Sequence, residues 1–183
     1  MSAFGTRVAP GGAVRSRAAL LRRIGRSLES AQRHDFGCVL LRLQLSGLDV
    51  LLRQHGDAFV ENALRVVVER LRRQVRMDDL VARTGNDEFA LIAQGVEGPR
   101  HPAGEAIAAR VLDSLTKAYG VDGIRFQLGL RIGIAGYPDD ATDPSALLLG
   151  ASQALHAARR LEQDGWRVAA PSSTLTGTAI RTR

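Results

Sequence analysis

Residues 81–93 read Val-Ala-Arg-Thr-Gly-Asn-Asp-Glu-Phe-Ala-Leu-Ile-Ala, two short apolar runs joined by a turn that carries two adjacent carboxylates. Asn and Gly tolerate the positive φ angles of a tight turn, so the stretch predicts a hairpin with Asp87 and Glu88 at or just past its tip. Gly85 lets backbone N–H groups approach an anion, and a carboxylate such as Asp87 is a preferred ligand of Mg²⁺. The simpler interpretation of these residues alone is an ordinary hairpin with solvated acids.

The composition around this hairpin is that of one globular domain. The chain has 183 residues, of which 45% are hydrophobic. No apolar run approaches the roughly 18 residues that a membrane span needs, and the N-terminal stretch lacks the apolar segment of a secretory signal. The single cysteine, Cys38, excludes an internal disulfide and fits a reducing compartment. We therefore expect a cytoplasmic protein without a membrane span, in which Cys38 is a buried strand residue.

The charge balance favours anionic partners. The 25 basic residues against 19 acidic ones give a formal net charge of +6. Nearly all of the basic residues are arginines, whose forked guanidinium groups bind phosphate well. Aromatic residues make up only 4% of the chain, however, and no zinc or helix-turn-helix spacing is present. We therefore do not expect a nucleic-acid partner.

Hydrophobic spacing predicts helices alternating with strands on both sides of the hairpin. Leu20, Ile24 and Leu28 lie on one stripe of an amphipathic helix, which we expect to pack on its own domain or to lead in from an upstream domain. Contact with a membrane is the weaker alternative for this helix. The predicted elements are the amphipathic helix 15–33, a strand 38–45, a short helix 48–56, a core helix 57–76, the hairpin 81–93, a helix bearing Ile107, Val111, Leu115 and Tyr119, a long alternating strand 124–134, a helix 144–161 capped by Asp143, and a strand 166–169.

This order of elements predicts an α/β (α+β) fold in which a mixed sheet is covered by helices. We expect the domain itself to span residues 34–170. Residues 1–14 are rich in Gly and Ala and are expected to be a flexible N-terminus. Residues 171–183 are rich in Ser and Thr and poor in apolar residues, so they are expected to be a linker or tail.

Several stretches together carry a family resemblance. The hairpin sequence is Gly85-Asn86-Asp87-Glu88-Phe89, where the GGDEF family has Gly-Gly-(Asp/Glu)-Glu-Phe. From about Phe36 to Val168 the chain resembles this family, the diguanylate cyclases that join two GTP molecules into cyclic di-GMP. The resemblance implies a ferredoxin-like, nucleotide-cyclase type mixed sheet of about five strands plus a hairpin, surrounded by helices. The other matching stretches, in the family order, are Leu40–Leu45, Gly56, Leu64, Arg76–Asp79, Arg131–Ile134 and Ala154–Arg159.

The chemistry that the resemblance implies is metal-assisted attack of a ribose 3′-hydroxyl on the α-phosphate of a second GTP, with Mg²⁺ held by carboxylates. Asp87 and Glu88 match the catalytic positions, and Asp87 also matches a metal ligand. The other metal carboxylate of the family lies at the end of the first strand, where this chain has Gln44. An amide oxygen is a poorer Mg²⁺ ligand than a carboxylate and supplies no negative charge. We therefore expect Mg²⁺ binding to be weakened and the catalytic residues to be vestigial.

The positions that match the substrate-binding residues also depart from the family. Gly85, Asn86, Glu61 and Arg159 occupy these positions and are expected to be vestigial. Asn86 adds a side chain where the second Gly of the family lets a phosphate lie on the backbone. The Asn that reads guanine in the family is Leu52 here, which forms no hydrogen bond to a base edge. The remaining departures are Leu48-Asp49, Asp57, Val60, Gln153 and His156.

A second candidate site is formed by Arg76 and Asp79. As a helix-end pair of opposite charges, the two residues have an ordinary structural interpretation. They also match the inhibitory site of the family, where Arg and Asp grip a guanine of cyclic di-GMP. An arginine forks onto O6 and N7 of guanine, and an aspartate accepts hydrogen bonds from N1 and N2. Arg72, Arg73 and Arg83 lie close in sequence and are candidates for phosphate contacts.

The resemblance and its departures together predict a degenerate GGDEF domain with little or no cyclase activity. We expect it to act as a regulatory, nucleotide-sensing or dimerisation module in bacterial cyclic di-GMP signalling. One alternative is a weakly active diguanylate cyclase that still uses Asp87 and Glu88. The other is a protein-interaction domain that binds no nucleotide. The expected partners are cyclic di-GMP or GTP, another signalling domain such as a sensor or an EAL-type phosphodiesterase, a protein partner, or a second copy of the chain.

Overall fold

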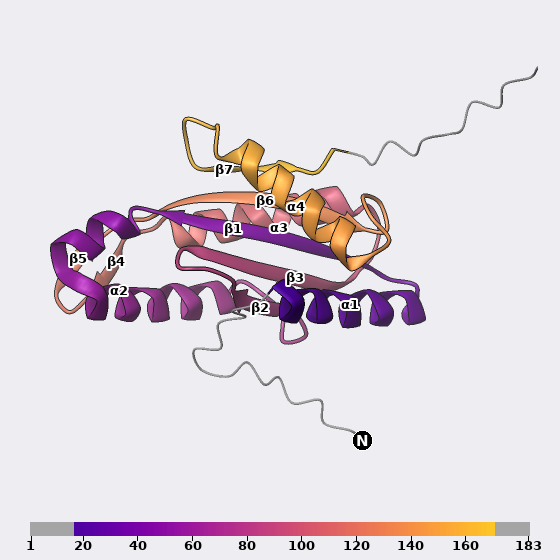
Figure 1. Ribbon diagram of the computed structural model, residues 1–183, viewed down its shortest axis with the longest axis horizontal. Coiled ribbons are helices and arrows are strands. Elements are labelled where there is room, and N and C mark those ends of the chain that lie inside the picture. Colours follow the sequence, from indigo (N-terminus) through magenta and orange to yellow (C-terminus); the bar gives the residue numbers. More distant parts are fainter. Residues whose placement is uncertain (1–16, 171–183) are drawn as a thin grey trace, which may run out of the picture.

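The computed structural model describes residues 17–170, so the expectations for residues 1–14 and 171–183 lie outside the described residues. The chain folds into a sheet with helices on both of its faces (Figure 1). The elements are α1 (Arg17–His34), β1 (Gly37–Ser46), α2 (Leu48–Arg72), β2 (Leu80–Arg83), β3 (Glu88–Val96), α3 (Arg100–Leu115), β4 (Tyr119–Val121), β5 (Ile124–Phe126), β6 (Gly129–Tyr137), α4 (Pro144–Ala158) and β7 (Gly165–Val168).

The main sheet has five strands in the order β2-β3-β1-β6-β7. All neighbouring strands are antiparallel except β6 and β7, which are parallel. The strands β4 and β5 form a separate hairpin beside α2. The predicted mixed α/β sheet covered by helices is therefore confirmed.

The alternation of side chains along β1 divides the core into two layers. Val39, Leu41 and Leu43 point to the face that α2 and α3 cover, and all three are fully buried. Cys38 and Leu40 point to the opposite face, which α1 and α4 cover. Each helix thus buries its apolar stripe against one face of the sheet, which is the main stabilising contribution to such a fold.

The amphipathic helix packs on its own domain, which is one of the two arrangements expected for it. Its apolar residues Leu20, Ile24, Leu28 and Ala31 are buried against the sheet and α4. The predicted cap of α4 is also confirmed. Asp143 precedes Pro144, and its Oδ1 accepts hydrogen bonds from the backbone N–H groups of the two residues after the proline, at 2.9 and 3.0 Å.

The predicted long strand 124–134 is wrong, because the chain divides it into β5 and β6. The residues before it form a tight turn, in which Asp122 and Gly123 have φ angles of 49° and 78°. This turn pairs β5 with β4 in a second sheet. Residues 127–128, between β5 and β6, belong to neither strand. Perfect alternation indicates an extended chain, but it does not show where that chain leaves one sheet for another.

The placement of Tyr119 on a helix is also wrong, since α3 ends at Leu115 and Tyr119 begins β4. Its hydroxyl donates to the Leu115 carbonyl at 2.7 Å, and the Arg70 guanidinium lies 3.8 Å from the ring centroid. Burial raises the pKa of Tyr119 to about 12, although Arg70 acts in the opposite direction. Arg70 also donates to the carbonyls of Ser114, Lys117 and Ala118, so a cation from α2 stabilises the end of α3.

The ends of two other helices lie before the predicted residues. The core helix ends at Arg72 rather than Arg76, and α4 ends at Ala158 rather than Leu161. The predicted division between a short helix and the core helix is present inside α2. Gly56 has φ 77° and ψ 176° there, which is not helical and is accessible chiefly to glycine.

Cys38 is fully buried in β1, as predicted. Burial raises the pKa of its thiol to about 12, and the charge of Arg100 acts in the opposite direction. The thiol therefore stays protonated at neutral pH and has no nucleophilic character. Within residues 17–170, no helix is long and apolar enough to cross a membrane.

Candidate functional site

The hairpin between β2 and β3 has the predicted position. Arg83 pairs with Phe89, and the Glu88 carbonyl accepts hydrogen bonds from the N–H groups of Thr84 and Gly85 at 2.8 and 3.2 Å. The expected positive φ angles are absent, because neither Gly85 nor Asn86 has one. The turn spans the four residues between the strands, and a longer turn closes the hairpin without left-handed residues.

Gln44 lies directly beside the hairpin carboxylates. It pairs across β1 and β3 with Glu88, so the two side chains are on the same face of the sheet. The Leu45 N–H also donates to the Asp87 carbonyl at 2.9 Å, which ties the hairpin tip to β1. The Gln44 Nε2 donates to Asp87 Oδ2 at 2.9 Å. The structure therefore brings together Gln44, Asp87 and Glu88, as the resemblance implied.

Two arginines complete this group. Arg159, from the end of α4, donates from Nε to Gln44 Oε1 at 2.6 Å and from a terminal nitrogen to Glu88 Oε1 at 2.9 Å. Arg42, two residues before Gln44 on β1, donates to Glu88 Oε2 at 2.5 Å. The result is a continuous set of hydrogen bonds from Asp87 through Gln44, Arg159 and Glu88 to Arg42. We call these five residues the carboxylate network.

The carboxylate network determines how the Gln44 amide is oriented. Its N–H faces the Asp87 carboxylate, and its oxygen faces the Arg159 guanidinium. The opposite orientation would place an oxygen against a carboxylate and an N–H against a cation, which are both repulsive arrangements. Gln44 therefore presents a donor, and not a ligand oxygen, to the position where a metal would bind Asp87.

Arg83 holds the hairpin tip from the other side. Its guanidinium donates to both carboxylate oxygens of Glu61 on α2 at 3.1 Å. It also donates to the carbonyls of Gly85 and Asn86 at 3.0 and 3.1 Å. Sequence reasoning missed this role, because it treated Arg83 as a candidate phosphate contact and Glu61 as a substrate-binding residue. All of the nitrogens of Arg83 are used within the fold.

A cleft of about 780 Å³ lies between the hairpin, the start of α2 and the end of α4. Glu61, Asn86, Asp87 and Arg159 line it, which brings most of the predicted substrate and metal residues to one place. Gly85 is adjacent at the exposed tip but is not part of the lining. The remaining lining residues are Gln44, Leu45, Ser46, Gly47, Leu48, Asp49, Leu52, Asp57, Val60, Arg83 and Arg131.

One wall of this cleft is apolar, and its charges are balanced. Leu52 is 43% exposed and faces the region together with Val60. The three lining arginines oppose four lining carboxylates, of Asp49, Asp57, Glu61 and Asp87. A triphosphate carries several negative charges, so a cleft with this balance attracts it weakly without added cations.

The donor set does not fit a pair of Mg²⁺ ions. Asp87 is the lining carboxylate that is hydrogen-bonded to Gln44 of β1, so one of its oxygens is already an acceptor. Both oxygens of Glu88 are taken by arginines, at 2.9 and 2.5 Å. Within residues 17–170, no group of three or more His, Cys, Asp or Glu side chains is placed to hold a metal ion.

The side chains of Arg76 and Asp79 do not form an ion pair with each other. Asp79 Oδ2 accepts from the Arg76 backbone N–H at 2.8 Å, and its Oδ1 accepts from the Gln94 backbone N–H at 3.1 Å. Asp79 therefore fixes the turn before β2. This role is structural, although it is not the ion pair with Arg76 that the sequence suggested. The Arg76 side chain is exposed and forms no hydrogen bond or ion pair to another described residue.

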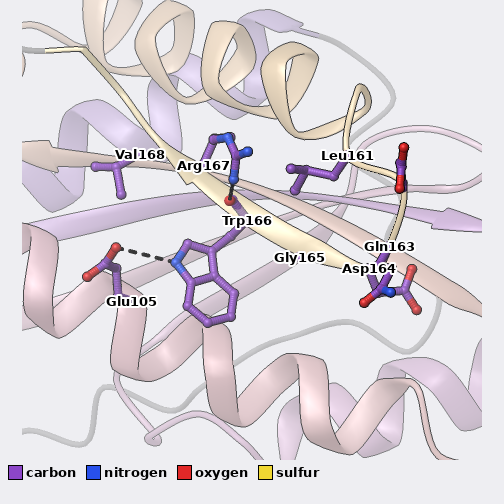
Figure 2. Close-up of a pocket in the computed structure, with 9 residues that line it drawn as sticks. Glu105, Leu161, Gln163, Asp164, Gly165, Trp166, Arg167 and Val168 are labelled. Carbon is purple, nitrogen blue, oxygen red and sulfur yellow. Dashed lines mark hydrogen bonds between the residues drawn. The ribbon is translucent and has the colours of Figure 1, made fainter.

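A second cleft, of about 510 Å³, lies beside the edge strand β7 (Figure 2). The Trp166 indole N–H donates to Glu105 Oε1 of α3 at 3.4 Å in this cleft. The residues that separate Arg159 from Gly165 form one of its walls. Asp164, in this wall, accepts from the Leu130 N–H at 2.8 Å and pairs with Arg131. This cleft contains none of the predicted site residues.

The comparisons with known proteins agree with the fold and the hairpin. The sequence model of the family described as "Diguanylate cyclase, GGDEF domain" matches residues 12–164. The chain therefore belongs to the GGDEF domain family of diguanylate cyclases.

Similar proteins of known structure or name include two from Pseudomonas aeruginosa. The diguanylate cyclase TpbB is 32% identical over 152 residues, which cover 80% of this chain and 34% of TpbB. A solved GGDEF domain of TpbB superposes with a TM-score of 0.78 at 30% identity, covering 85% of this chain and 90% of that one. The bifunctional diguanylate cyclase and cyclic di-GMP phosphodiesterase MucR is 28% identical over 145 residues, 79% of this chain and 21% of MucR. The chain thus spans between a fifth and about a third of the length of these curated relatives.

Proposed function

We propose that this chain is a degenerate GGDEF domain, a regulatory module of cyclic di-GMP signalling with little or no cyclase activity. The observation that carries the proposal is the Gln44 amide, whose N–H binds Asp87 and whose oxygen binds Arg159. These contacts replace the carboxylate and the metal ion that the family chemistry requires at this position. The cyclic di-GMP signalling role is supported by the names of the relatives, TpbB and MucR.

The state of Glu88 supports the same conclusion. Its side chain is only 26% exposed, and its carboxylate is held by Arg42 and Arg159. Charge-assisted hydrogen bonds of this kind are roughly twice as strong as neutral ones. A metal ion or a substrate hydroxyl would have to displace at least one guanidinium before Glu88 took part in the reaction. The positions of the cleft that match the guanine-binding residues of the family are also altered. Leu52 forms no hydrogen bond to a base, and Glu61 is occupied by Arg83.

The partners follow from the family and from the relatives. A solved complex joins the diguanylate cyclase SiaD to its activator SiaC, and the name of MucR couples cyclase and phosphodiesterase activities. We propose that this domain acts on another signalling domain or on a protein partner, and that a homodimer is one arrangement. Location in the cytoplasm, where GTP is available, is part of the same proposal.

The cyclase test is incubation of the protein with GTP and either Mg²⁺ or Mn²⁺, with chromatography of the nucleotides. We expect neither pppGpG nor cyclic di-GMP above the level of a reaction without protein. The TpbB GGDEF domain, assayed in parallel, controls for the reaction conditions. Accumulation of cyclic di-GMP that depends on Asp87, and is lost in Asp87→Asn, would contradict the proposal and favour a weakly active cyclase.

We also propose that Arg76 and Asp79 bind cyclic di-GMP. The exposed Arg76 guanidinium is available for the O6 and N7 atoms of guanine, and Asp79 is held in one orientation by two backbone N–H groups. Each carboxylate oxygen retains acceptor capacity for the N1 and N2 edge of the base.

Calorimetric titration with cyclic di-GMP tests this site. We expect Arg76→Ala to weaken binding about tenfold or more, because a good bidentate contact to guanine contributes about 1–3 kcal/mol. Arg125→Ala is the matched control, since Arg125 is an exposed arginine on β5, outside the main sheet. If Arg76→Ala binds as tightly as the parent, the assignment is wrong. If the parent releases no heat with cyclic di-GMP or GTP, the domain is a protein-interaction module.

A further inference from the structure

The most basic helix of the described chain is α1. Five arginines and one glutamate give α1 a formal charge of +4. Residues 35–170 contain 16 basic and 18 acidic residues, which give a formal charge of −2. Residues 65–76 form a second basic stretch, with five arginines and one glutamate, but the acids elsewhere in residues 35–170 outweigh it, whereas α1 has a single acid. Figure 1 shows α1 as an outer helix of the fold. The arginines of α1 are Arg17, Arg22, Arg23, Arg26 and Arg33.

The side chains of these arginines form no interaction that stabilises the described fold. The apolar stripe of α1 is buried against the sheet and α4, so the arginines lie on the outer side of the helix. Four of them are exposed, and Arg23 is half-buried. None of the five guanidinium groups forms an ion pair or hydrogen bond with another residue of the described chain. Arg22, Arg26 and Arg33 follow each other at helical spacing along one line of the surface.

The shape of this surface selects among anionic partners. A helix that lies on a domain is convex, and neither of the two clefts described above includes a residue of α1. A protein partner normally anchors an aromatic or arginine side chain in a pocket, and neither of the two clefts opens on the outer face of α1. A nucleic acid would extend past the helix onto the body, which has a net negative charge. A flat anionic surface would contact only the convex outer face of α1, and residues 35–170 would face away from it.

We propose that the outer face of α1 adsorbs the domain to anionic phospholipid bilayers. The apolar stripe of the helix stays in the core, so contact is made by guanidinium groups and lipid phosphates without insertion. The charge distribution also orients the molecule, with α1 toward the lipid. This docking surface is separate from the nucleotide cleft, because α1 contributes no residue to that cleft.

Co-sedimentation of the full chain with vesicles tests the proposal. We expect binding to phosphatidylcholine vesicles that contain phosphatidylserine, and no binding to phosphatidylcholine alone. Binding is expected to be strong near a salt concentration of about 0.1 M or below and lost well above it, since screening shortens the range of these interactions. Arg22→Gln combined with Arg26→Gln is expected to lower the partition coefficient at least tenfold, because each basic residue near such a surface contributes about 1 kcal/mol.

The matched control is Arg65→Gln combined with Arg125→Gln, which removes the same charge from exposed positions on α2 and β5. We expect this pair to bind within about twofold of the parent. Glutamine is a good helix former, and melting curves check that each variant is folded. If the α1 variant unfolds, Arg26→Gln with Arg33→Gln replaces it. Equal binding to neutral vesicles, equal losses in both pairs, or tighter binding to duplex DNA at the same salt concentration would overturn the proposal.

Discussion

Replacing Gln44 with aspartate is expected to create a divalent-cation site and to destabilise the metal-free domain. The substitution removes the amide N–H from which Asp87 Oδ2 accepts at 2.9 Å, and it adds a carboxylate on a side chain that is one methylene shorter. Two neighbouring carboxylates repel each other, and a lost hydrogen bond to a charged group costs about 1.5–3 kcal/mol. A divalent cation between the introduced carboxylate and that of Asp87 would remove this repulsion. We expect Mn²⁺ or Mg²⁺ to raise the melting temperature of the variant by several degrees and that of the parent hardly at all.

Gln44→Asn is the matched control for this experiment. It keeps an amide but shortens the side chain by one methylene, so the contacts to Asp87 and Arg159 are lost without any added charge. We expect Gln44→Asn to melt at a lower temperature than the parent and to show no rescue by metal. Equal stabilisation of parent and Gln44→Asp by Mn²⁺ would show that the parent already holds a cation. It would also remove the main argument against cyclase activity.

Replacing Gly133 with alanine is expected to lower the free energy of unfolding by about 3 kcal/mol or more, at the upper end of the range for overpacked cores. Gly133 is buried in β6 under α4. A Cβ at this position would lie 2.1 Å from the Leu155 nitrogen and 2.2 Å from the Ala151 oxygen. Both atoms belong to the backbone of α4, which cannot yield as a flexible side chain does. The helix would have to move off the sheet, away from the contacts that it makes with β6.

Urea denaturation measures this effect, and Gly120→Ala is its control. Gly120 lies in β4, where an added Cβ meets no atom within 4 Å. We expect that substitution to change the free energy of unfolding by no more than about 0.5 kcal/mol, as for other surface sites. Gly133→Ala should also displace Arg159, which follows α4, from Glu88. An unchanged midpoint for Gly133→Ala would mean that α4 does not approach β6 as closely as described.

The elements could be predicted from the sequence where one physical signal determined them. The apolar stripe of α1, the Asp143 cap and the two apolar runs around the hairpin all depend on local periodicity or a local hydrogen bond. The boundary between β5 and β6 was missed because the apolar alternation of residues 124–134 continues across it. The end of α3 was missed for another reason, since Arg70 from a distant helix binds the Ser114 carbonyl in its last turn and the Lys117 carbonyl just after it.

The candidate site was predicted in part. The resemblance located Gln44, Asp87 and Arg159, and the structure brings them together. Arg42 was missed, although its position two residues before Gln44 places it on the same face of β1. Its pairing with Glu88 depends on the strand register, which a single sequence does not reveal. The bond of Arg83 to Glu61 joins residues from different elements, so no local pattern could have indicated it.

The break at Gly56 has a consequence for how the cleft admits a molecule. Residues 48–55, which carry Asp49 and Leu52 along one wall, join the rest of α2 through a residue outside helical geometry. Only Leu48 and Leu51 of this segment are buried, whereas the second part of α2 is anchored through Leu64, Val67 and Leu71. A helix this short has little stability of its own. We therefore expect this wall to open locally while the sheet and the long segment of α2 remain folded, so that access to the cleft does not require global unfolding.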